Sequence, residues 1–303
     1  SSAGGDRTLI FWEVENGREI ARVNCEFENN TLGFLPDSST TTVFCTNGDS
    51  TRRYDLKKLD APSVIAWGPD ASINSVAIAP SGNSVVAIDN IGSITFWDPV
   101  TAKPRAVISE TYRHLQSVDF SPDGHLIAVA VESANEEPVV ELRDAASGQI
   151  MKTLKGHSRY VTSAAFSPDG KTLATGGEDR QIKLWDVSSG QERLTMKGHS
   201  NSVKTVSVSR DGARLVSEGL DERGRVWDVK TGTQLLEFES YAQAKFSPDG
   251  KLIATGGANH FVRLLDAFTG REIRSLRGHS GAVRAIEFSP DGKRLASAGE
   301  DQT

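Results

Sequence analysis

Short stretches of alternating apolar and polar residues, each ending in a turn signal, recur along this chain of 303 residues. One such stretch, Val161 to Ser167, leads into Ser-Pro-Asp-Gly, whose proline and glycine favour a tight turn. Three further runs of strand length follow at 173–177, 182–186 and 193–197. The pattern predicts four short antiparallel strands per unit. Because four strands cannot bury both faces of their sheet alone, neighbouring units must stack.

The unit repeats in register along the chain. Its clearest copies span residues 156–186 and 198–228, and another begins at Gly278. The residue pairs that close the units are Trp12-Glu13, Tyr54-Asp55, Trp97-Asp98, Arg143-Asp144, Trp185-Asp186, Trp227-Asp228 and Leu265-Asp266. Successive pairs lie 42, 43, 46, 42, 42 and 38 residues apart. The length of the chain therefore reflects the number of repeats and does not indicate several domains.

The last unit would close beyond the final residue, Thr303, so its missing strands must come from the N-terminus. Residues 7–14 have the sequence of a third strand with no first or second strand before it. We therefore predict one ring of seven units over residues 1–303, with the closing unit built from about 282–301 plus 7–24. Closure matters because an open ring would leave two sheet edges unpaired.

The Gly-His start, the Trp-Asp close and the spacing between them resemble the WD40-repeat family over essentially the whole chain. The resemblance implies an all-β fold, a seven-bladed β-propeller of four-stranded antiparallel blades. The regular Ser-Pro-Asp-Gly-Lys and Ser-Gly-Gln repeats are similar to those of bacterial members. Because the repeat is interrupted at both ends, we expect a module of a longer protein.

Three units carry a histidine, a hydroxyl residue, an aspartate and a tryptophan in repeat register. These sets are His157, Thr175, Asp179 and Trp185; His199, Ser217, Asp221 and Trp227; and His279, Ser297, Asp301 and Trp12. The same side chains make a hydrolase triad, but a nucleophile needs one exposed site with an oxyanion hole. The family resemblance implies instead a hydrogen-bonded chain from indole to carboxylate that satisfies buried polar groups. We expect structural tetrads and no catalytic residues.

Composition narrows the function further. The formal net charge of −6 argues against a general nucleic-acid binder, and no apolar run is long enough to span a membrane. Cys25 and Cys45 fit a reducing compartment, so we expect a cytoplasmic protein. No phosphate-binding loop or zinc-protease motif is present, and His114, His125 and His260 are scattered. We therefore expect no cofactor, no metal site and no enzyme activity.

Length variation points to one face of the ring. The long interval contains residues 132–138, a second–third turn, and the short interval removes part of the link before Tyr241; both lie on the face opposite the Ser-Pro-Asp-Gly turns. Variable loops on a rigid scaffold are common recognition sites, and the family resemblance implies peptide binding there. The candidate contacts are Tyr112, Arg113, His114, Glu136, Glu137, Arg159, Tyr160, Glu178, Asn201, Leu220, Tyr241, Asn259 and Glu300.

The leading hypothesis is a monomeric, non-catalytic scaffold that binds partner proteins or peptide segments around the mouth of the central channel. Two alternatives stay open. The ring could be the regulatory or sensor module of a larger protein, or it could hold a small ligand or a hydrolytic site in the channel. Convergent acids or histidines at equivalent blade positions would favour the last alternative.

Overall fold

The computed structural model describes residues 7–25, 29–34, 42–47, 50–55, 63–65, 73–101, 103–109, 113–133, 137–256 and 260–299. Within these ranges the chain forms strands and turns. The described part of the chain contains no helix that is long and apolar enough to cross a membrane.

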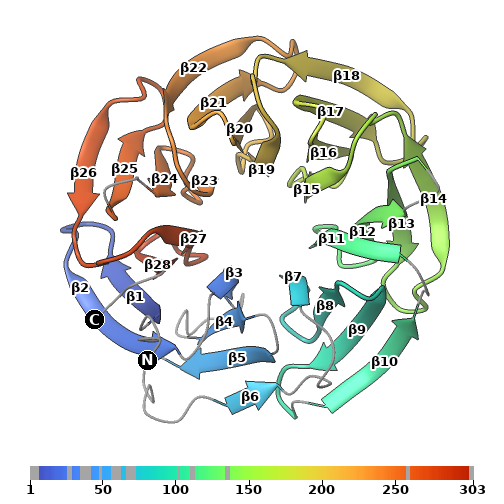
Figure 1. Ribbon diagram of the computed structural model, residues 1–303, viewed down its shortest axis with the longest axis horizontal. Coiled ribbons are helices and arrows are strands. Elements are labelled where there is room, and N and C mark those ends of the chain that lie inside the picture. Colours follow the sequence, from blue (N-terminus) through green and yellow to red (C-terminus); the bar gives the residue numbers. More distant parts are fainter. Residues whose placement is uncertain are drawn as a thin grey trace, which may run out of the picture.

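The described strands form seven four-stranded antiparallel sheets, which are arranged as a ring (Figure 1). We call the sheets blades one to seven, in the order of their closing pairs from Tyr54-Asp55 to Trp12-Glu13. Blades one to three contain β3 (Asn29–Phe34), β4 (Thr42–Asn47), β5 (Ser50–Asp55) and β6 (Ser63–Ile65); β7 (Ile73–Ile78), β8 (Val85–Asp89), β9 (Ser93–Asp98) and β10 (Lys103–Ser109); and β11 (Arg113–Phe120), β12 (Leu126–Ser133), β13 (Val139–Asp144) and β14 (Ile150–Lys155).

Blades four to six contain β15 (Val161–Phe166), β16 (Thr172–Gly177), β17 (Gln181–Asp186) and β18 (Glu192–Lys197); β19 (Val203–Val208), β20 (Arg214–Gly219), β21 (Arg223–Asp228) and β22 (Gln234–Glu239); and β23 (Ala244–Phe246), β24 (Leu252–Gly256), β25 (Val262–Asp266) and β26 (Glu272–Leu276). The first strand of each blade faces the centre of the ring and the fourth lies at its rim (Figure 1). The predicted all-β propeller of four-stranded antiparallel blades is confirmed.

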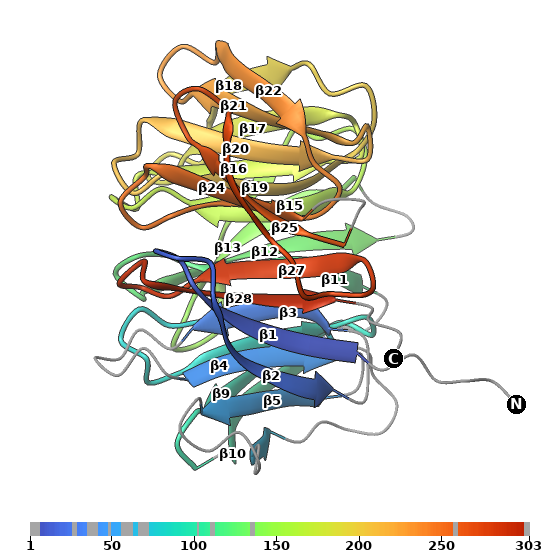
Figure 2. The ribbon, with the colours of Figure 1, turned by 90° about the vertical axis from the view of Figure 1, so that its left-hand side faces the viewer.

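Blade seven joins the two ends of the chain. It contains β27 (Val283–Phe288), β28 (Arg294–Gly299), β1 (Arg7–Glu13) and β2 (Glu19–Cys25), in that order from the centre. β1 pairs antiparallel with β28, with Thr8 opposite Gly299 and Trp12 opposite Leu295. The four strands form one continuous sheet in the side view (Figure 2). The predicted closure of the ring by N-terminal and C-terminal strands is confirmed.

Neighbouring blades bury each other's faces. Between blades three and four, Ala128 and Val140 of one sheet pack with Val161 and Phe166 of the next in a single apolar cluster. Between blades four and five, Leu184 packs in the same way with residues of β19 and β20. Because the core is divided among these seams, each blade depends on its neighbours for burial.

The turns between first and second strands repeat one hydrogen-bonded design. In blade four, the Ser167 hydroxyl donates to Asp169 at 2.6 Å, and the Asp169 carboxylate accepts the backbone N–H of Lys171 at 3.1 Å. Gly170 has a φ of 69°, a left-handed conformation that suits glycine. Blades three, five, six and seven show the same Ser–Asp bond. Local chemistry therefore explains why these turns vary so little.

Blade three closes on a buried ion pair instead of a tryptophan. Arg143 is 2% exposed, and its guanidinium lies 2.5 Å from the carboxylate of Glu141 on the same strand. The guanidinium also donates to the carbonyl of Gly148 at 3.1 Å. Arg143 thus fills the closing position of the repeat with a charged group that its neighbours neutralise.

We predict that Glu141→Ala lowers the free energy of unfolding by about 3–5 kcal/mol, because it leaves a buried guanidinium without its carboxylate. Glu19→Ala is the matched control, since Glu19 pairs with Arg22 at 2.9 Å and the two side chains are 34% and 35% exposed. Its loss should lower stability by about 1 kcal/mol or less. Urea unfolding followed by circular dichroism measures both, and equal effects of the two substitutions would contradict the prediction.

Candidate functional site

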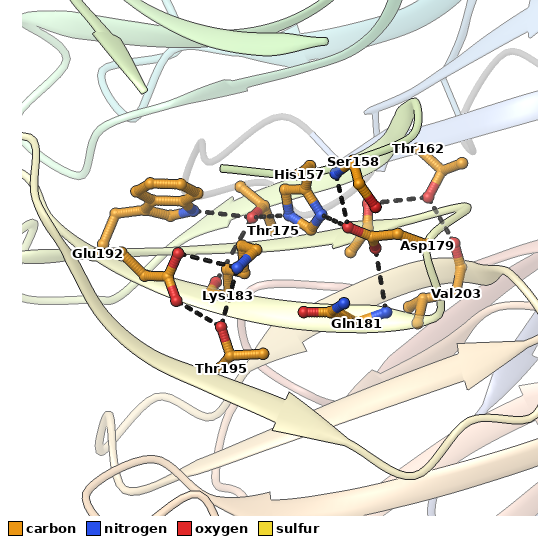
Figure 3. A network of polar contacts seen from close by, with 12 residues as sticks. His157, Ser158, Thr162, Thr175, Asp179, Gln181, Lys183, Glu192, Thr195 and Val203 are labelled. Atoms are coloured by element: carbon orange, nitrogen blue, oxygen red, sulfur yellow. Dashed lines mark hydrogen bonds and ion pairs between the residues drawn. The ribbon is translucent and has the colours of Figure 1, made fainter. Parts of the chain in front are cut away.

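Blade four joins four side chains in one hydrogen-bonded chain (Figure 3). The indole N–H of Trp185 donates to Thr175 Oγ1 at 2.8 Å, and Thr175 Oγ1 lies 2.8 Å from His157 Nε2. His157 Nδ1 lies 2.9 Å from an Asp179 carboxylate oxygen. Trp185 and Thr175 belong to β17 and β16, His157 to the link before β15, and Asp179 to the turn between β16 and β17. These hydrogen bonds therefore connect the link before β15 and the β16–β17 turn to the two central strands of the sheet.

The Thr175 hydroxyl is the centre of these contacts. It accepts from the Trp185 indole at 2.8 Å, donates to the backbone carbonyl of Lys183 at 3.5 Å, and lies 2.8 Å from His157 Nε2. One buried hydroxyl therefore contacts three polar groups of the blade.

The carboxylates of the tetrads are held in their ionised form. Burial alone would raise the pKa of Asp179, but hydrogen bonds from His157 and from the backbone N–H groups of Ser158 and Gln181 lower it below its usual value. The pKa of Asp221 is lowered in the same way against burial, by His199 and the N–H of Ser200. These carboxylates complete the turns by accepting backbone donors.

Blade five repeats the chain and adds a cation. Ser217 lies 2.8 Å from both the Trp227 indole nitrogen and His199 Nε2, and His199 Nδ1 lies 2.9 Å from Asp221. The Arg225 guanidinium pairs with Asp221 at 2.8 Å. Burial lowers the pKa of His199, and the guanidinium acts in the same direction. The neutral form of the His199 imidazole is therefore favoured in blade five.

Blade seven assembles the chain from both ends of the sequence. The Trp12 indole donates to Ser297 at 2.8 Å, and His279 Nε2 lies 2.7 Å from the same hydroxyl, across a separation of 285 residues between Trp12 and Ser297. Asp301, the predicted fourth member, lies outside the described residues. The structure therefore brings three of these four residues together.

Two glycines of the repeat make room for the tetrad. A Cβ on Gly278 would lie 2.6 Å from the Trp12 ring, and a Cβ on Gly219 would lie 2.5 Å from His199 and 2.6 Å from Asp221. Both are closer than carbon atoms approach in proteins. The Gly-His start and the glycine before the turn are thus steric requirements of the network.

The tetrads offer a substrate no accessible nucleophile. The hydroxyl residues Thr175, Ser217 and Ser297 are all 0% exposed, and each accepts a hydrogen bond from a tryptophan. Blade six has Thr255 at this position, and Ser240 occupies the place of the histidine at 2.6 Å. In blade six, two hydroxyl groups thus bond each other at the position where blades four, five and seven have a hydroxyl and an imidazole.

The predicted contact residues gather on the face formed by the links between blades and the second–third turns, which we call the link face. Backbone bonds join link to turn within a blade, from Glu178 to Tyr160 at 2.8 Å and from Leu220 to Ser202 at 2.8 Å. Exposed on this face are His114, Glu137, Arg159, Tyr160, Asn201 and Leu220. Glu178 and Tyr241 are half-buried. Tyr112, Glu136, Asn259 and Glu300 lie outside the described residues, as does the side chain of Arg113.

Tyr160 lies among carboxylates. A hydrogen bond to Glu132 and the nearby charge of Glu178 raise the pKa of its phenol. Glu132 also accepts from Gln116 at 3.1 Å, which connects this group to the mouth of the channel. The link face of blades three and four is therefore acidic around an exposed aromatic ring.

The centre of the ring encloses a cavity of about 660 Å³ lined by the first strands of the blades. Asp119, Lys245 and Glu287 line it from β11, β23 and β27, and Lys245 pairs with Glu287 at 3.5 Å. Burial raises the pKa of Asp119 to about 6. In the described ranges, no three histidine, cysteine, aspartate or glutamate residues group as a metal site.

These three channel residues were not among the site residues expected from the sequence. Each directly precedes the Phe-Ser-Pro of its repeat, as Asp119-Phe120, Lys245-Phe246 and Glu287-Phe288. The corresponding residues of blades two and four are Ala77 and Ala165. Aligning the repeats at this one position would have found the charged residues, because they stand at the same place on the first strands that line the cavity.

A ring of stacked, four-stranded antiparallel sheets with indole-to-carboxylate chains defines a β-propeller. The family description "WD domain, G-beta repeat" matches residues 148–186, 190–228, 241–266 and 270–303. These matches fall on the later blades, where the tetrads are most complete. The chain belongs to the WD40-repeat family.

Known relatives match parts of the chain. WD repeat and SOCS box-containing protein 1 of Homo sapiens is 34% identical over 31% of this chain and 22% of its own length. A protein LST8 homolog of Drosophila pseudoobscura pseudoobscura is 23% identical over 59% of this chain and 58% of its own. WD repeat-containing protein SL1-17 of Schistosoma mansoni is 29% identical over 58% of each chain. The matches thus span less than two thirds of each relative.

We predict that Ser217→Ala lowers the free energy of unfolding by about 2–4 kcal/mol, because the Trp227 indole and His199 both lose their partner in a buried site. Ser200→Ala removes an exposed hydroxyl from the same blade and should change stability by about 0.5 kcal/mol or less. Chemical denaturation compares the two. A Ser217→Ala protein as stable as the control would exclude a structural role for the hydrogen bonds among Trp227, Ser217 and His199.

The stabilisation by Asp221 should depend on pH. Its pKa is lower in the folded protein than in the unfolded chain, so the folded state binds fewer protons and acid favours unfolding. We predict that Asp221→Asn lowers stability by about 3 kcal/mol at neutral pH. The difference from the wild type should shrink as the pH falls below about 4. Denaturation at a series of pH values measures it, and a constant difference would contradict the assignment.

Proposed function

We propose that the seven-sheet ring is a monomeric, non-catalytic scaffold that binds partner proteins or peptide segments on the link face around the channel mouth. One contrast carries the proposal. The hydroxyl–imidazole–carboxylate sets are buried inside the blades, whereas Arg159, Tyr160 and Leu220 are exposed at the ends of a rigid framework. Aromatic and arginine side chains on such a surface supply much of the energy of protein binding.

Charge favours a partner with a basic segment. The link face of blades three and four carries Glu132 and Glu178 near Tyr160, and the whole chain has a net charge of −6. Complementary charge speeds encounter and rejects acidic competitors. The same charge argues against nucleic acid as a partner. A cytoplasmic location and the absence of membrane partners stay predictions from the sequence.

Two other functions are tied to particular observations. One relative is named for WD repeats together with a SOCS box, which supports a module that serves a larger protein. Asp119, Lys245 and Glu287 in the central cavity favour a small polar ligand or a hydrolytic site. Turnover in a broad hydrolase panel that Asp119→Asn abolishes would replace the scaffold with an enzyme.

We predict that the double variant Arg159→Glu, Tyr160→Ala loses specific partners in affinity capture from the source cell. The loss should be at least about tenfold, because removing an anchor worth about 1.4 kcal/mol has that effect on affinity. Lys171→Glu is the control, since Lys171 is exposed on a Ser-Pro-Asp-Gly turn of the opposite face. Quantitative mass spectrometry compares the three captures. Identical partner lists for both variants would remove the link face as the binding surface.

A further inference from the structure

Adjacent blades are joined near the channel by a bond from a backbone N–H of one first strand to a side chain of the preceding one. The bonds are Val118 to Ser75 at 3.3 Å, Ala164 to Ser117 at 3.1 Å, Val206 to Ser163 at 3.2 Å and Ile286 to Gln243 at 3.4 Å. They lie at the seams between blades two and three, three and four, four and five, and six and seven. The pattern makes this bond a regular part of the ring.

The seam between blades five and six departs from the pattern. Thr205 occupies the position of Ser163, yet its Oγ1 is buried and has no hydrogen-bond partner in the described part of the chain. The facing strand, β23, is three residues long and begins only at Ala244, whereas β15, β19 and β27 have six residues. β23 therefore begins at Ala244, the residue whose N–H would donate to Thr205 if this seam followed the pattern.

Glu218 lies directly opposite Thr205 in the ladder between β19 and β20. Blade four has Gly176 at this position, where a Cβ would lie 2.6 Å from Val203 and 3.1 Å from Val206 of the next blade. Blade five has room for a longer side chain, because Ala244 stands in blade six where Val206 stands in blade five. The seam therefore holds a carboxyl group at a position that is glycine in blade four.

The Glu218 carboxyl is buried without a full set of partners. Glu218 is 1% exposed, and its Oε2 has no hydrogen-bond partner among the described residues. Burial raises its pKa to about 8; Asp221 acts in the same direction, and Lys204 on β19 opposes it. Two nearby cations are paired with other carboxylates: Arg225 on β21 pairs with Asp221 and Glu237, and Lys245 on β23 pairs with Glu287. Tyr241, on the link into β23, is the other titratable group at this end.

The opposite end of the same seam is firmly held. Arg214 on β20 donates to the carbonyls of Ala267 at 2.8 Å and Gly250 at 2.7 Å, both in blade six. Its guanidinium lies 4.2 Å from the ring centre of Phe268 and 5.3 Å from that of Phe246. This clamp ties blades five and six together beside the Ser-Pro-Asp-Gly turns, away from the link face.

We propose that Glu218 is a proton-operated latch at the link-face end of the seam between blades five and six. With a neutral carboxyl the seam is closed. When the carboxyl ionises, it moves to water, β23 separates from β19 at that end, and the Arg214 clamp acts as the hinge. Opening changes the surroundings of Leu220 and Tyr241 on the link face, but the latch does not depend on the proposed function.

The direction of the pH effect follows from the two states. The closed seam holds the proton up to about pH 8, whereas an exposed glutamate loses it near its ordinary pKa of 4.5. The closed state therefore binds more protons, and its stability is fully present below that ordinary value. As the pH rises from about 4.5 to about 8, the opening constant should increase by up to about tenfold per pH unit, and then level off.

Amide hydrogen exchange of the folded protein tests the latch. Protection of the amides in β19 and β23, corrected for base-catalysed intrinsic exchange, should fall by up to about tenfold per pH unit between about pH 5 and about pH 8. Glu218→Gln should abolish this dependence. A second variant, Glu218→Gly, introduces the residue that blade four has at this position, and it should abolish the dependence as well. Glu239→Gln, an exposed carboxyl of the same blade, should behave as the wild type.

Two results would overturn the latch. One is an equal pH dependence in the wild type and in a folded Glu218 variant. The other is a wild-type decline that is the same at the seam between blades four and five, where the Val206–Ser163 bond is present. A decline confined to β19 and β23, and absent from the Glu218 variants, supports it.

Discussion

The ladder between β1 and β28 is the interaction on which the rest of the structure depends. Each blade has two apolar faces, and only a neighbour on each side can cover them, so a single open seam would expose core along its whole height. The pairing also places Trp12 against Ser297, and therefore completes a buried polar chain as well as a sheet. Backbone closure and side-chain satisfaction are achieved by the same contact.

The blades differ in how they satisfy their buried polar groups. Blades four and five use the full chain from indole to carboxylate, blade six uses two hydroxyls, and blade three uses Arg143 with Glu141. Each arrangement satisfies buried polar groups within its own blade. The seam between blades five and six differs, because Glu218 and Thr205 each have a buried oxygen without a hydrogen-bond partner among the described residues, and the seam lacks a bond that four others have. Function that requires movement is best sought where compensation is missing.

The repeat register carried most of the predictable information. It located the strands of blade seven and placed Trp12 beside Ser297 and His279, although they are far apart in sequence. It could not reveal the charged channel, because Asp119, Lys245 and Glu287 are chemically different residues and only their shared position relates them. Nor could it reveal Glu218, whose significance depends on Ala244 of another blade making room for it. The repeat pattern describes each blade on its own, so it does not predict contacts between side chains of different blades.

Closure by the chain's own ends has a consequence for synthesis on the ribosome. β1 and β2 emerge before β27 and β28, the strands that complete their sheet, and Trp12 precedes its partner Ser297 by 285 residues. Leu9 and Phe11 of this hairpin can pack with Leu32 and Phe34 of blade one, but the edge of β1 lacks its partner strand until β28 is made. The final seam then forms by docking two preassembled surfaces, which makes the last step of folding resemble the association of subunits.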